Sequence, residues 1–303
     1  MILISQIFKS DISPHYRQFY IFDNKLLIDF KHIVSIDTLH INVKLSKDQL
    51  NYLLNTYTYK HLRKDSIFKF YISSNNIFIK LCTDYPLSHN VQIQLQDASN
   101  IDKTALYIDL IKLLYNSYHY FTRLDIAYDF LVPFKFSYAL KRHGKQRRKA
   151  VGEQSYNTGS TRNKQRKMTT AHYNRNLKLQ SKVEYANRFE CRTQFQAKDN
   201  CTIHNINHDF IREQLNKELF IPNYHLYFDN EIVKLIDSSK TIDNENIIKD
   251  TLSRKQYSDF RKKFKARSVD LSTYYNQALH NGLYDFLSIS KVTNEQAIDE
   301  LLA

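Results

Sequence analysis

Three short segments of this chain combine carboxylates, arginines and a tyrosine at alternating positions. They are Phe121–Phe130 (FTRLDIAYDF), Thr169–Leu177 (TTAHYNRNL) and Asn187–Thr193 (NRFECRT). Because side chains alternate along a strand, each segment predicts a strand with one polar and one apolar face. Carboxylates, arginines and a tyrosine on one side of a sheet indicate a metal-assisted phosphoryl-transfer site.

The polar faces of the first and third segments carry acids interleaved with arginines. Their members are Arg123, Asp125, Asp129, Arg188, Glu190 and Arg192. Oxygen-ligand sites for Mg²⁺ or Mn²⁺ are built from one or two carboxylates together with substrate phosphate. Asp125 and Glu190 on neighbouring strands suit that role. Asp129 lies about 13 Å from Asp125 along an extended strand, at roughly 3.3 Å per residue, which makes it the secondary candidate for a metal ligand.

The second segment contributes Tyr173, two residues from Arg175 and so on the same face of a regular strand. A tyrosine that attacks phosphorus forms a covalent phosphotyrosine and preserves the energy of the bond, so a cut strand can be rejoined. The competing interpretation is structural, because a carboxylate beside arginines on adjacent strands is often a cross-strand ion pair. Tyr173 is also one of 22 tyrosines. The residue pattern alone leaves both interpretations open.

The elements that must position these residues indicate an α+β fold with a central, mainly antiparallel sheet. Short apolar or alternating runs predict strands within 16–45 and at 68–72, 77–82 and 91–95. Ser46 with Gln49 is a capping-box signal for a helix through about Tyr57. Asp102 is the expected N-cap of a helix that leads into FTRLDIAYDF. A second helix is expected over 137–150.

The composition shifts towards helix from about residue 200. Helical spacing predicts helices over 207–220 and 230–236, and the polar stretch 237–247 is the expected linker. The tail contains a basic helical segment, 254–267. We therefore predict an α+β core over 1–200, followed by a mostly helical region, 201–303, that serves DNA binding or oligomerisation.

The positive charge of the chain is localised. The formal net charge is +13, and residues 135–192 hold 16 Lys and Arg against three acids. The remainder is balanced, so the whole excess surrounds the candidate site. A solvated surface would mix both signs, and the pattern therefore indicates a polyanionic partner.

Several protein classes are disfavoured by what the sequence lacks. Only four glycines occur, and no GxGxxG or GxxxxGK[ST] pattern supports nucleotide binding by those routes. Three scattered cysteines without CxxC spacing predict reduced thiols and no zinc module. The first residues lack the pattern of a signal peptide, and no apolar run approaches the roughly 20 residues of a membrane span. We expect a soluble intracellular protein.

Four motifs in sequence resemble those of the rolling-circle replication initiators of small plasmids and filamentous phages (the Rep_trans and phage gene II-like group). The first is T-R-hydrophobe-D-hydrophobe-A-x-D, at 122–129, and the second is Tyr-x-x-Gly-Ser, at 156–160. The third is Tyr-Asn/Asp-Lys, matched at 173–175 with Arg175 in place of the usual lysine. The fourth is Arg-hydrophobe-Glu-x-Arg, at 188–192. The resemblance covers about residues 90 to 195.

The resemblance implies a role for each matched residue. Tyr173 would be the nicking nucleophile, Asp125 and Glu190 would hold the divalent ion, and Arg175 would face the scissile phosphate. An arginine keeps the charge of the usual lysine but changes its geometry. Tyr156 and Tyr185 remain alternative nucleophiles.

The function implied is initiation of replication in a bacterial cytoplasm. The protein would bind duplex and single-stranded origin DNA and nick one strand with Mg²⁺ or Mn²⁺. It would stay attached to the 5′ end and rejoin the strand later. A host helicase and polymerase are the implied partners. A homodimer would supply the two nucleophilic attacks that strand cutting and rejoining require. The side chains expected to contact DNA are Arg123, Arg142, Lys145, Arg147, Arg148, Lys149, Arg162, Lys164, Arg166, Lys167, Arg188, Arg192, Lys262 and Lys263.

Two rival functions stay open from the sequence. A non-enzymatic origin-binding or copy-control protein would share the charge pattern without needing Tyr173 or a metal ion. A mobilisation relaxase would share strand nicking, but it normally brings a histidine-rich metal motif, and no His-x-His or His-hydrophobe-His triplet occurs in this chain.

Overall fold

A computed structural model describes about two thirds of the chain. The described residues are 20–22, 25–27, 34–63, 66–82, 89–130, 132–140, 148–149, 155–157, 168–180, 183, 187–195, 201–202, 206–241, 246–276 and 278–279. The chain forms two compact units, each assembled from separate segments. Unit 1 comprises Met1–Val34, Ala127–Cys191 and Asp209–Tyr275, and unit 2 comprises Ser35–Ile126, Arg192–His208 and Asn276–Ala303.

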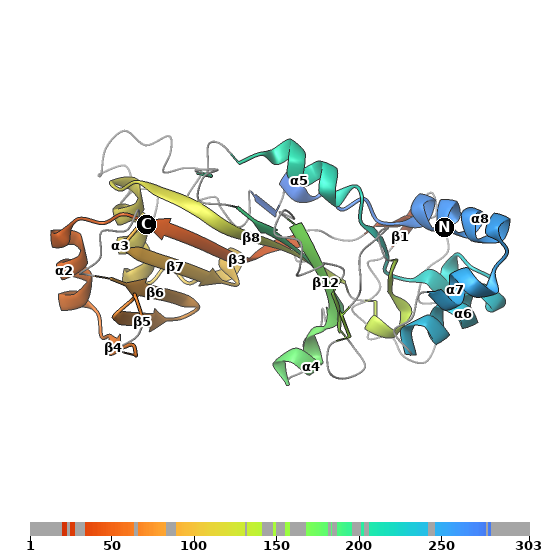
Figure 1. Ribbon diagram of the computed structural model, residues 1–303, viewed down its shortest axis with the longest axis horizontal. Coiled ribbons are helices and arrows are strands. Elements are labelled where there is room, and N and C mark those ends of the chain that lie inside the picture. Colours follow the sequence, from red (N-terminus) through yellow and green to blue (C-terminus); the bar gives the residue numbers. More distant parts are fainter. Residues whose placement is uncertain are drawn as a thin grey trace. The chain divides into compact units, whose positions relative to one another are not determined.

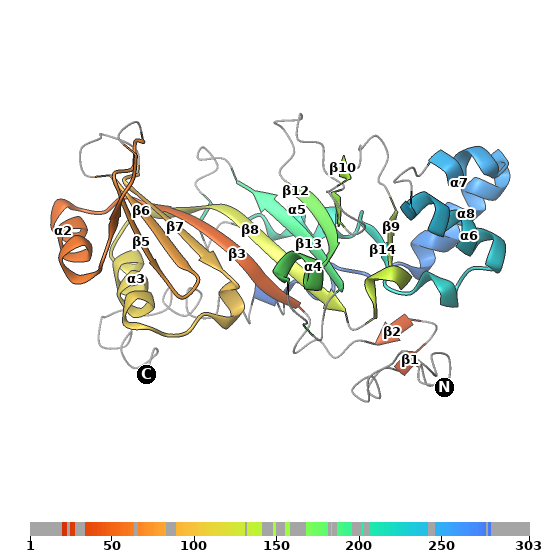
Figure 2. The same cartoon turned by 90° about the horizontal axis from the view of Figure 1, so that it is seen from below.

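Unit 2 contains a sheet with two helices beside it (Figures 1 and 2). Its elements are β3 (Val34–Val43), α2 (Lys47–Thr56), β4 (Lys60–His61), β5 (Phe70–Ser74), β6 (Ile77–Leu81), β7 (Val91–Gln96), α3 (Ala105–Tyr115) and the first part of β8 (His119–Phe130). Alternation along β6 and β7 buries the odd-numbered residues, among them Ile79 and Ile93. The helices bury only apolar or aromatic side chains, such as Leu53 and Ile111. One face of this sheet therefore belongs to a core, and the other is polar.

Unit 1 carries the first two strands, strands that follow β8 and the C-terminal helices. Its elements are β1 (Tyr20–Phe22), β2 (Lys25–Leu27), β9 (Tyr138–Leu140), β10 (Arg148–Lys149), β11 (Ser155–Asn157), β12 (Met168–Asn174), α4 (Arg175–Leu179), β13 (Asn187–Gln194), α5 (His208–Leu215), β14 (Leu219–Ile221), α6 (Asn230–Thr241), α7 (Asn246–Thr251) and α8 (Arg254–Arg267). The last three helices share a core with β9 and β14 that includes Tyr138, Ile221, Ile236 and Phe264.

The main sheet has ten strands in the order β10-β11-β12-β13-β8-β3-β7-β6-β5-β4. Registered pairs such as β3 with β7 and β11 with β12 are antiparallel. Two further pairs, β1-β2 and β14-β9, form small antiparallel sheets. The predicted α+β class with a mainly antiparallel central sheet is confirmed.

Several local predictions are confirmed by the structure. Ser46 and Gln49 form the expected capping box, in which each side chain accepts a hydrogen bond from the other residue's backbone N–H. Strands β5, β6, β7, β8 and β13 lie where alternation predicts them, within one or two residues, and β12 begins as predicted but ends at Asn174, where α4 replaces the expected strand. The basic helix predicted over 254–267 is α8.

Other local predictions are wrong. The helix expected over 137–150 is not present in its described part, because 138–140 forms β9 and pairs with β14, some 80 residues further along the chain. The linker expected over 237–247 is helical in its described parts, which belong to α6 and α7. Thr104 caps α3 in place of Asp102, since its hydroxyl accepts the backbone N–H of Tyr107. The predicted functional division near residue 200 stays a prediction.

Candidate functional site

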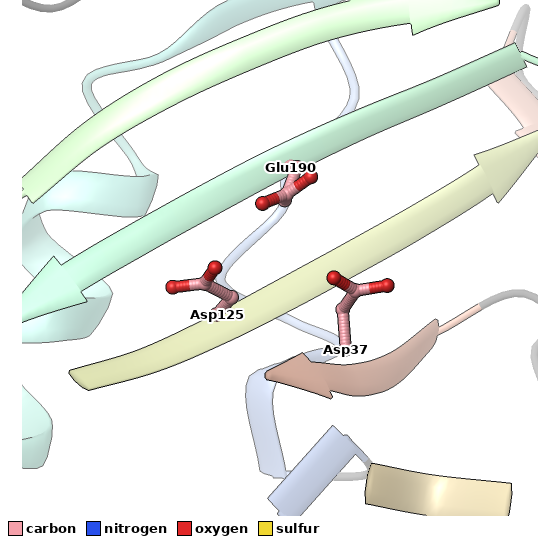
Figure 3. Close-up of side chains that lie close together, drawn as sticks. All are labelled: Asp37, Asp125 and Glu190. Carbon is pink, nitrogen blue, oxygen red and sulfur yellow. The ribbon is translucent and has the colours of Figure 1, made fainter. Parts of the chain in front are cut away.

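Three carboxylates from three strands lie close together (Figure 3). Asp37 comes from β3, Asp125 from β8 and Glu190 from β13, and one oxygen of each lies within 4.8 Å of the others. The three strands are neighbours in the sheet order β13-β8-β3. Asp125 is fully buried and Glu190 is 1% exposed, whereas Asp37 is half-buried. Grouped carboxylates repel one another unless a cation or protons balance them. All three are hard oxygen donors, so this set fits Mg²⁺ or Mn²⁺.

Tyr173 is tied to this acidic group by a direct hydrogen bond. Its hydroxyl donates to Oε2 of Glu190 over 2.7 Å, and both side chains are buried. β12 and β13 are neighbours in the sheet, which brings the two residues together from adjacent strands. The contact places the tyrosine oxygen beside a group that can accept its proton.

Arginines balance part of the negative charge. Arg123 donates hydrogen bonds to both oxygens of Asp125. Its Nε lies 2.8 Å from Oδ1, and its Nη2 donates to Oδ2. Arg192 places its Nε 3.9 Å from Oδ2 of the same carboxylate. Arg123 and Arg192 are 28% and 36% exposed, so both guanidinium groups are also open to solvent. The closest ion pair of Asp125 therefore lies within β8, and the cross-strand pair expected from the sequence corresponds to the longer contact with Arg192.

Asp129 lies outside the acidic group and holds two arginines. Arg188 approaches it in fork geometry, with Nε and Nη2 each 2.6 Å from a different carboxylate oxygen. Arg175 donates from Nη1 to Oδ2 over 3.2 Å. Asp129 and Arg188 are both buried, whereas the Arg175 side chain is 23% exposed. Asp129 thus positions both guanidinium groups.

Arg175 differs from its expected place on a strand. It is the first residue of α4, after Asn174, whose side chain caps that helix by accepting the backbone N–H of Asn176. The side-chain oxygen of an asparagine competes well for a backbone donor, which ends the strand before Arg175. The position of the Arg175 guanidinium is therefore set by its contact with Asp129 and not by strand alternation.

His172 points to the opposite face from Tyr173, as strand alternation predicts. Its Nε2 lies 2.9 Å from the hydroxyl of Ser137 and 3.0 Å from Oδ1 of Asn187. All three residues are buried, and Phe134 packs against the imidazole with a ring-centroid distance of 4.5 Å. This buried polar network fixes the neighbouring strands β12 and β13 behind the candidate site.

Asp37 is the residue that the sequence interpretation missed. The runs that predict strands within 16–45 do not include Asp37, and the nearest matched motif lies more than 80 residues away in the sequence. The available signal is a single carboxylate in a strand with no other acidic residue, which calls for a partner when it is partly buried. Of the two alternative nucleophiles, Tyr156 lies on β11 with its backbone opposite His172, and Tyr185 lies outside the described residues.

The predicted DNA-contacting residues are only partly described. Arg123 and Arg192 lie beside Asp125, and Arg188 is 4% exposed and bound to Asp129. Lys262 and Lys263 are exposed on α8. The backbone of Arg148 and Lys149 forms β10. The remaining predicted contacts lie outside the described residues: Arg142, Lys145, Arg147, Arg162, Lys164, Arg166 and Lys167.

Two further predictions concern cysteines and membranes. Within the described residues, Cys82, Cys191 and Cys201 are buried and none of them forms a disulfide. In the described part of the chain, no helix has the length and apolarity needed to cross a bilayer.

Comparisons with known proteins give a distant structural likeness. No protein-family model matches the sequence, and no curated protein matches it. Among solved structures, the chain is similar to a rolling circle replication initiator protein from Geobacillus stearothermophilus. The TM-score is 0.39 and the sequence identity 11%, and the likeness covers 62% of this chain and 86% of the other.

Proposed function

We propose that this protein is a replication initiator that binds an origin and nicks one DNA strand through Tyr173, with a divalent ion held by acidic side chains. The observation that carries the proposal is the hydrogen bond from the Tyr173 hydroxyl to Glu190 within a group of three carboxylates. The order of the four sequence motifs supports the same assignment.

The covalent step follows from this contact. The Tyr173 oxygen attacks the phosphorus of a phosphodiester while its proton passes to the Glu190 carboxylate. The bond between phosphorus and the 3′ oxygen breaks and that oxygen takes a proton from water, which leaves a 3′-hydroxyl and a 5′-phosphotyrosine. In the reverse step the 3′-hydroxyl attacks the phosphotyrosine, and Tyr173 recovers a proton. Arg175, fixed by Asp129, supplies positive charge for the phosphate.

Asp37, Asp125 and Glu190 would hold the ion, and when bound it would polarise the phosphate and stabilise the charge that develops on its oxygens. A carboxylate has two oxygens, so Glu190 can accept the Tyr173 hydrogen bond with one and keep the other for the ion. Arg123 balances Asp125 and lies at the same side of β8.

Metal binding can be tested without activity. Asp37→Asn and Glu190→Gln each remove one ligand charge while keeping side-chain volume. Each is expected to weaken Mn²⁺ binding at least about tenfold, because affinity at oxygen sites follows ligand charge and number. Isothermal titration of the metal-free protein with Mn²⁺ measures this. Asp102→Asn, at an exposed position outside the group, is the matched control. Unchanged Mn²⁺ affinity in both ligand variants would show that the carboxylates form only a structural cluster.

One observation favours a second candidate function, that of an origin-binding protein without nuclease activity. Tyr173 is only 5% exposed, so its hydroxyl must become accessible to DNA before it can attack. In a non-enzymatic protein the same contact would be a structural hydrogen bond. Supercoiled origin DNA with Mg²⁺ or Mn²⁺ separates the two functions. Nicking with a protein–DNA adduct supports the first, and tight binding without nicking supports the second.

A basic stripe on α8 is proposed as the contact with duplex DNA. Phe260 and Phe264 anchor the helix in the C-terminal core. Lys255, Lys262 and Lys265 are exposed and recur at helical spacing on the opposite side. Lys263, also exposed, lies over the ring of Phe228, with its Nζ 5.3 Å from the centroid. The first three lysines are therefore the best placed to reach phosphates.

The basic stripe is expected to change how the affinity for duplex DNA depends on salt concentration. Changing Lys255, Lys262 and Lys265 together to Gln is expected to reduce the slope of log K against log salt for duplex origin DNA by about 2.7, since each phosphate contact contributes about 0.9. Fluorescence anisotropy across a salt series measures the slope. A triple Gln variant at Lys47, Lys60 and Lys103, exposed in unit 2, is the matched control. Equal slopes in the two triple variants would exclude α8 as a specific contact.

A further inference from the structure

The polar face of the unit 2 sheet is hollowed into a pocket of about 360 Å³. It lies over β3, β7, β6 and β5, on the side away from the core. Amide side chains dominate it, contributed by Asn42, Gln92, Gln94 and Gln96. Among the described residues that line the pocket, none is acidic.

Strand register arranges the lining into two cross-strand rows. Directly opposed residues of antiparallel strands share a face. In the first row His40 opposes Gln94, which opposes Phe78. In the second row Asn42 opposes Gln92, Gln92 opposes Lys80, and Lys80 opposes Tyr71. Each row therefore begins with a hydrogen-bonding group, contains a glutamine amide and ends at an aromatic ring, and Lys80 stands before the ring in the second row.

The aromatic end of the pocket forms a platform. The rings of Tyr71 and Phe78 are nearly parallel, with an interplanar angle of 22° and centroids 6.4 Å apart. Both side chains are partly exposed. Aromatic rings on an open sheet face are the surfaces on which single-stranded nucleic acids stack their bases. Amides beside such a platform offer both a donor and acceptors to a base edge.

The electrostatics of the pocket favour a neutral base next to a phosphate. Burial, with the positive charges of Arg123 and Lys80, lowers the pKa of His40 to about 4, so its imidazole is neutral at pH 7. The buried Nε2 of that ring has no hydrogen-bond partner within the described part of the chain. Lys80 is exposed at the pocket and supplies a cation for the backbone of a bound strand.

We propose that this pocket binds bases of single-stranded DNA. A base stacks on the Tyr71 and Phe78 platform, its edge meets the amide rows, and the adjacent phosphate pairs with Lys80. The choice of DNA as the polymer rests on the proposed function, but the pocket requires no cleavage and no metal ion. A strand-separated origin is the natural source of such a ligand.

The test measures binding of the full chain to fluorescein-labelled oligonucleotides by fluorescence anisotropy. EDTA is present, so nicking does not contribute to the signal. Tyr71→Ala and Phe78→Ala are each expected to weaken single-strand binding roughly 5- to 150-fold, the usual range for loss of one stacking ring. Phe78→Leu keeps apolar volume but loses stacking, and it should weaken binding as well. Tyr118→Ala removes a 55% exposed ring outside the pocket and should leave binding unchanged.

Two further measurements distinguish base binding in the pocket from a general affinity of the protein for DNA. Lys80→Gln is expected to reduce the salt slope by about 0.7, the contribution of one phosphate contact on a single strand. Gln94→Ala is expected to flatten the preference among the four homopolymers. If the Tyr71 and Phe78 variants fold and bind every oligonucleotide like the parent, the pocket is not a base-binding site. Nicking is scored separately with Tyr173→Phe, so failure of one proposal leaves the other measurable.

Discussion

Replacement of Tyr173 by phenylalanine is expected to reduce nicking of supercoiled origin DNA by at least about a thousandfold and to abolish the covalent adduct. The ring and its packing are kept, and only the oxygen that would attack phosphorus is lost. Loss of the nucleophile in a covalent enzyme typically costs several orders of magnitude, because no other group is placed for the same displacement. The measurement is conversion of supercoiled to open-circular DNA, with the adduct detected by denaturing electrophoresis.

A control at another tyrosine makes this result specific. Tyr118→Phe changes an exposed hydroxyl outside the acidic group and should nick like the parent. If the adduct persists in Tyr173→Phe, the nucleophile is another tyrosine, and Tyr156→Phe and Tyr185→Phe identify it. If binding and nicking are both unchanged, the hydrogen bond from Tyr173 to Glu190 is structural.

The catalytic proposal also predicts how Glu190 and Tyr173 depend on each other. Glu190→Gln keeps an oxygen that can accept the hydrogen bond, but it cannot take a proton as a carboxylate does. Combining it with Tyr173→Phe should therefore add little to the loss of nicking caused by Tyr173→Phe alone, since both act on one step. Additive losses would place the two residues in separate roles.

Strand alternation is the sequence signal that best predicts which side chains share a face. It predicts that Arg123, Asp125 and Asp129 share a face, and that His172 and Tyr173 point to opposite faces, because the side-chain period of a strand is two. It does not tell which strands are neighbours in the sheet. Asp37 joins Asp125 only through the order β13-β8-β3, which sets a strand near the N-terminus beside one about 90 residues later.

Errors arose where distant pairing or local capping decides the structure. Residues 138–140 form β9 because β14 supplies its partner, a contact between segments about 80 residues apart. Arg175 begins a helix because Asn174 captures a backbone N–H, which a two-residue period cannot indicate. In the first case the geometry comes from a distant strand, and in the second from a local side-chain cap that overrides strand alternation.

Asp129 and Asp125 have the same chemical type, and their residue type alone does not predict their different contacts. The separation of the two carboxylates along the strand predicts that they do not bind one ion together. The structure shows what each carboxylate contacts: Asp125 lies in the acidic group and Asp129 binds Arg188 and Arg175. Neighbouring charges therefore give two carboxylates on one face different environments.

Asp129→Asn is expected to destabilise the protein by about 3–5 kcal/mol, the usual cost of removing one partner from a buried ion pair. Arg188 is 4% exposed and makes two 2.6 Å contacts with this carboxylate, so its charge would be left buried without compensation. Urea unfolding followed by far-ultraviolet circular dichroism measures the change, since the chain has no tryptophan. Arg175→Gln removes the longer and more exposed contact of the same carboxylate and should cost less than about 1 kcal/mol.

A compensating double variant tests the physical cause. Asp129→Leu with Arg188→Met removes both charges and fills similar volume, so it should recover much of the stability lost in Asp129→Asn. Its nicking should remain impaired, because Arg175 would lose the contact with Asp129 that fixes its guanidinium. If Asp129→Asn instead unfolds like the parent but loses Mn²⁺ affinity, Asp129 is a metal ligand, as the sequence suggested as a secondary possibility. Stability and ion binding thus report separately on the two roles that one carboxylate on β8 can have.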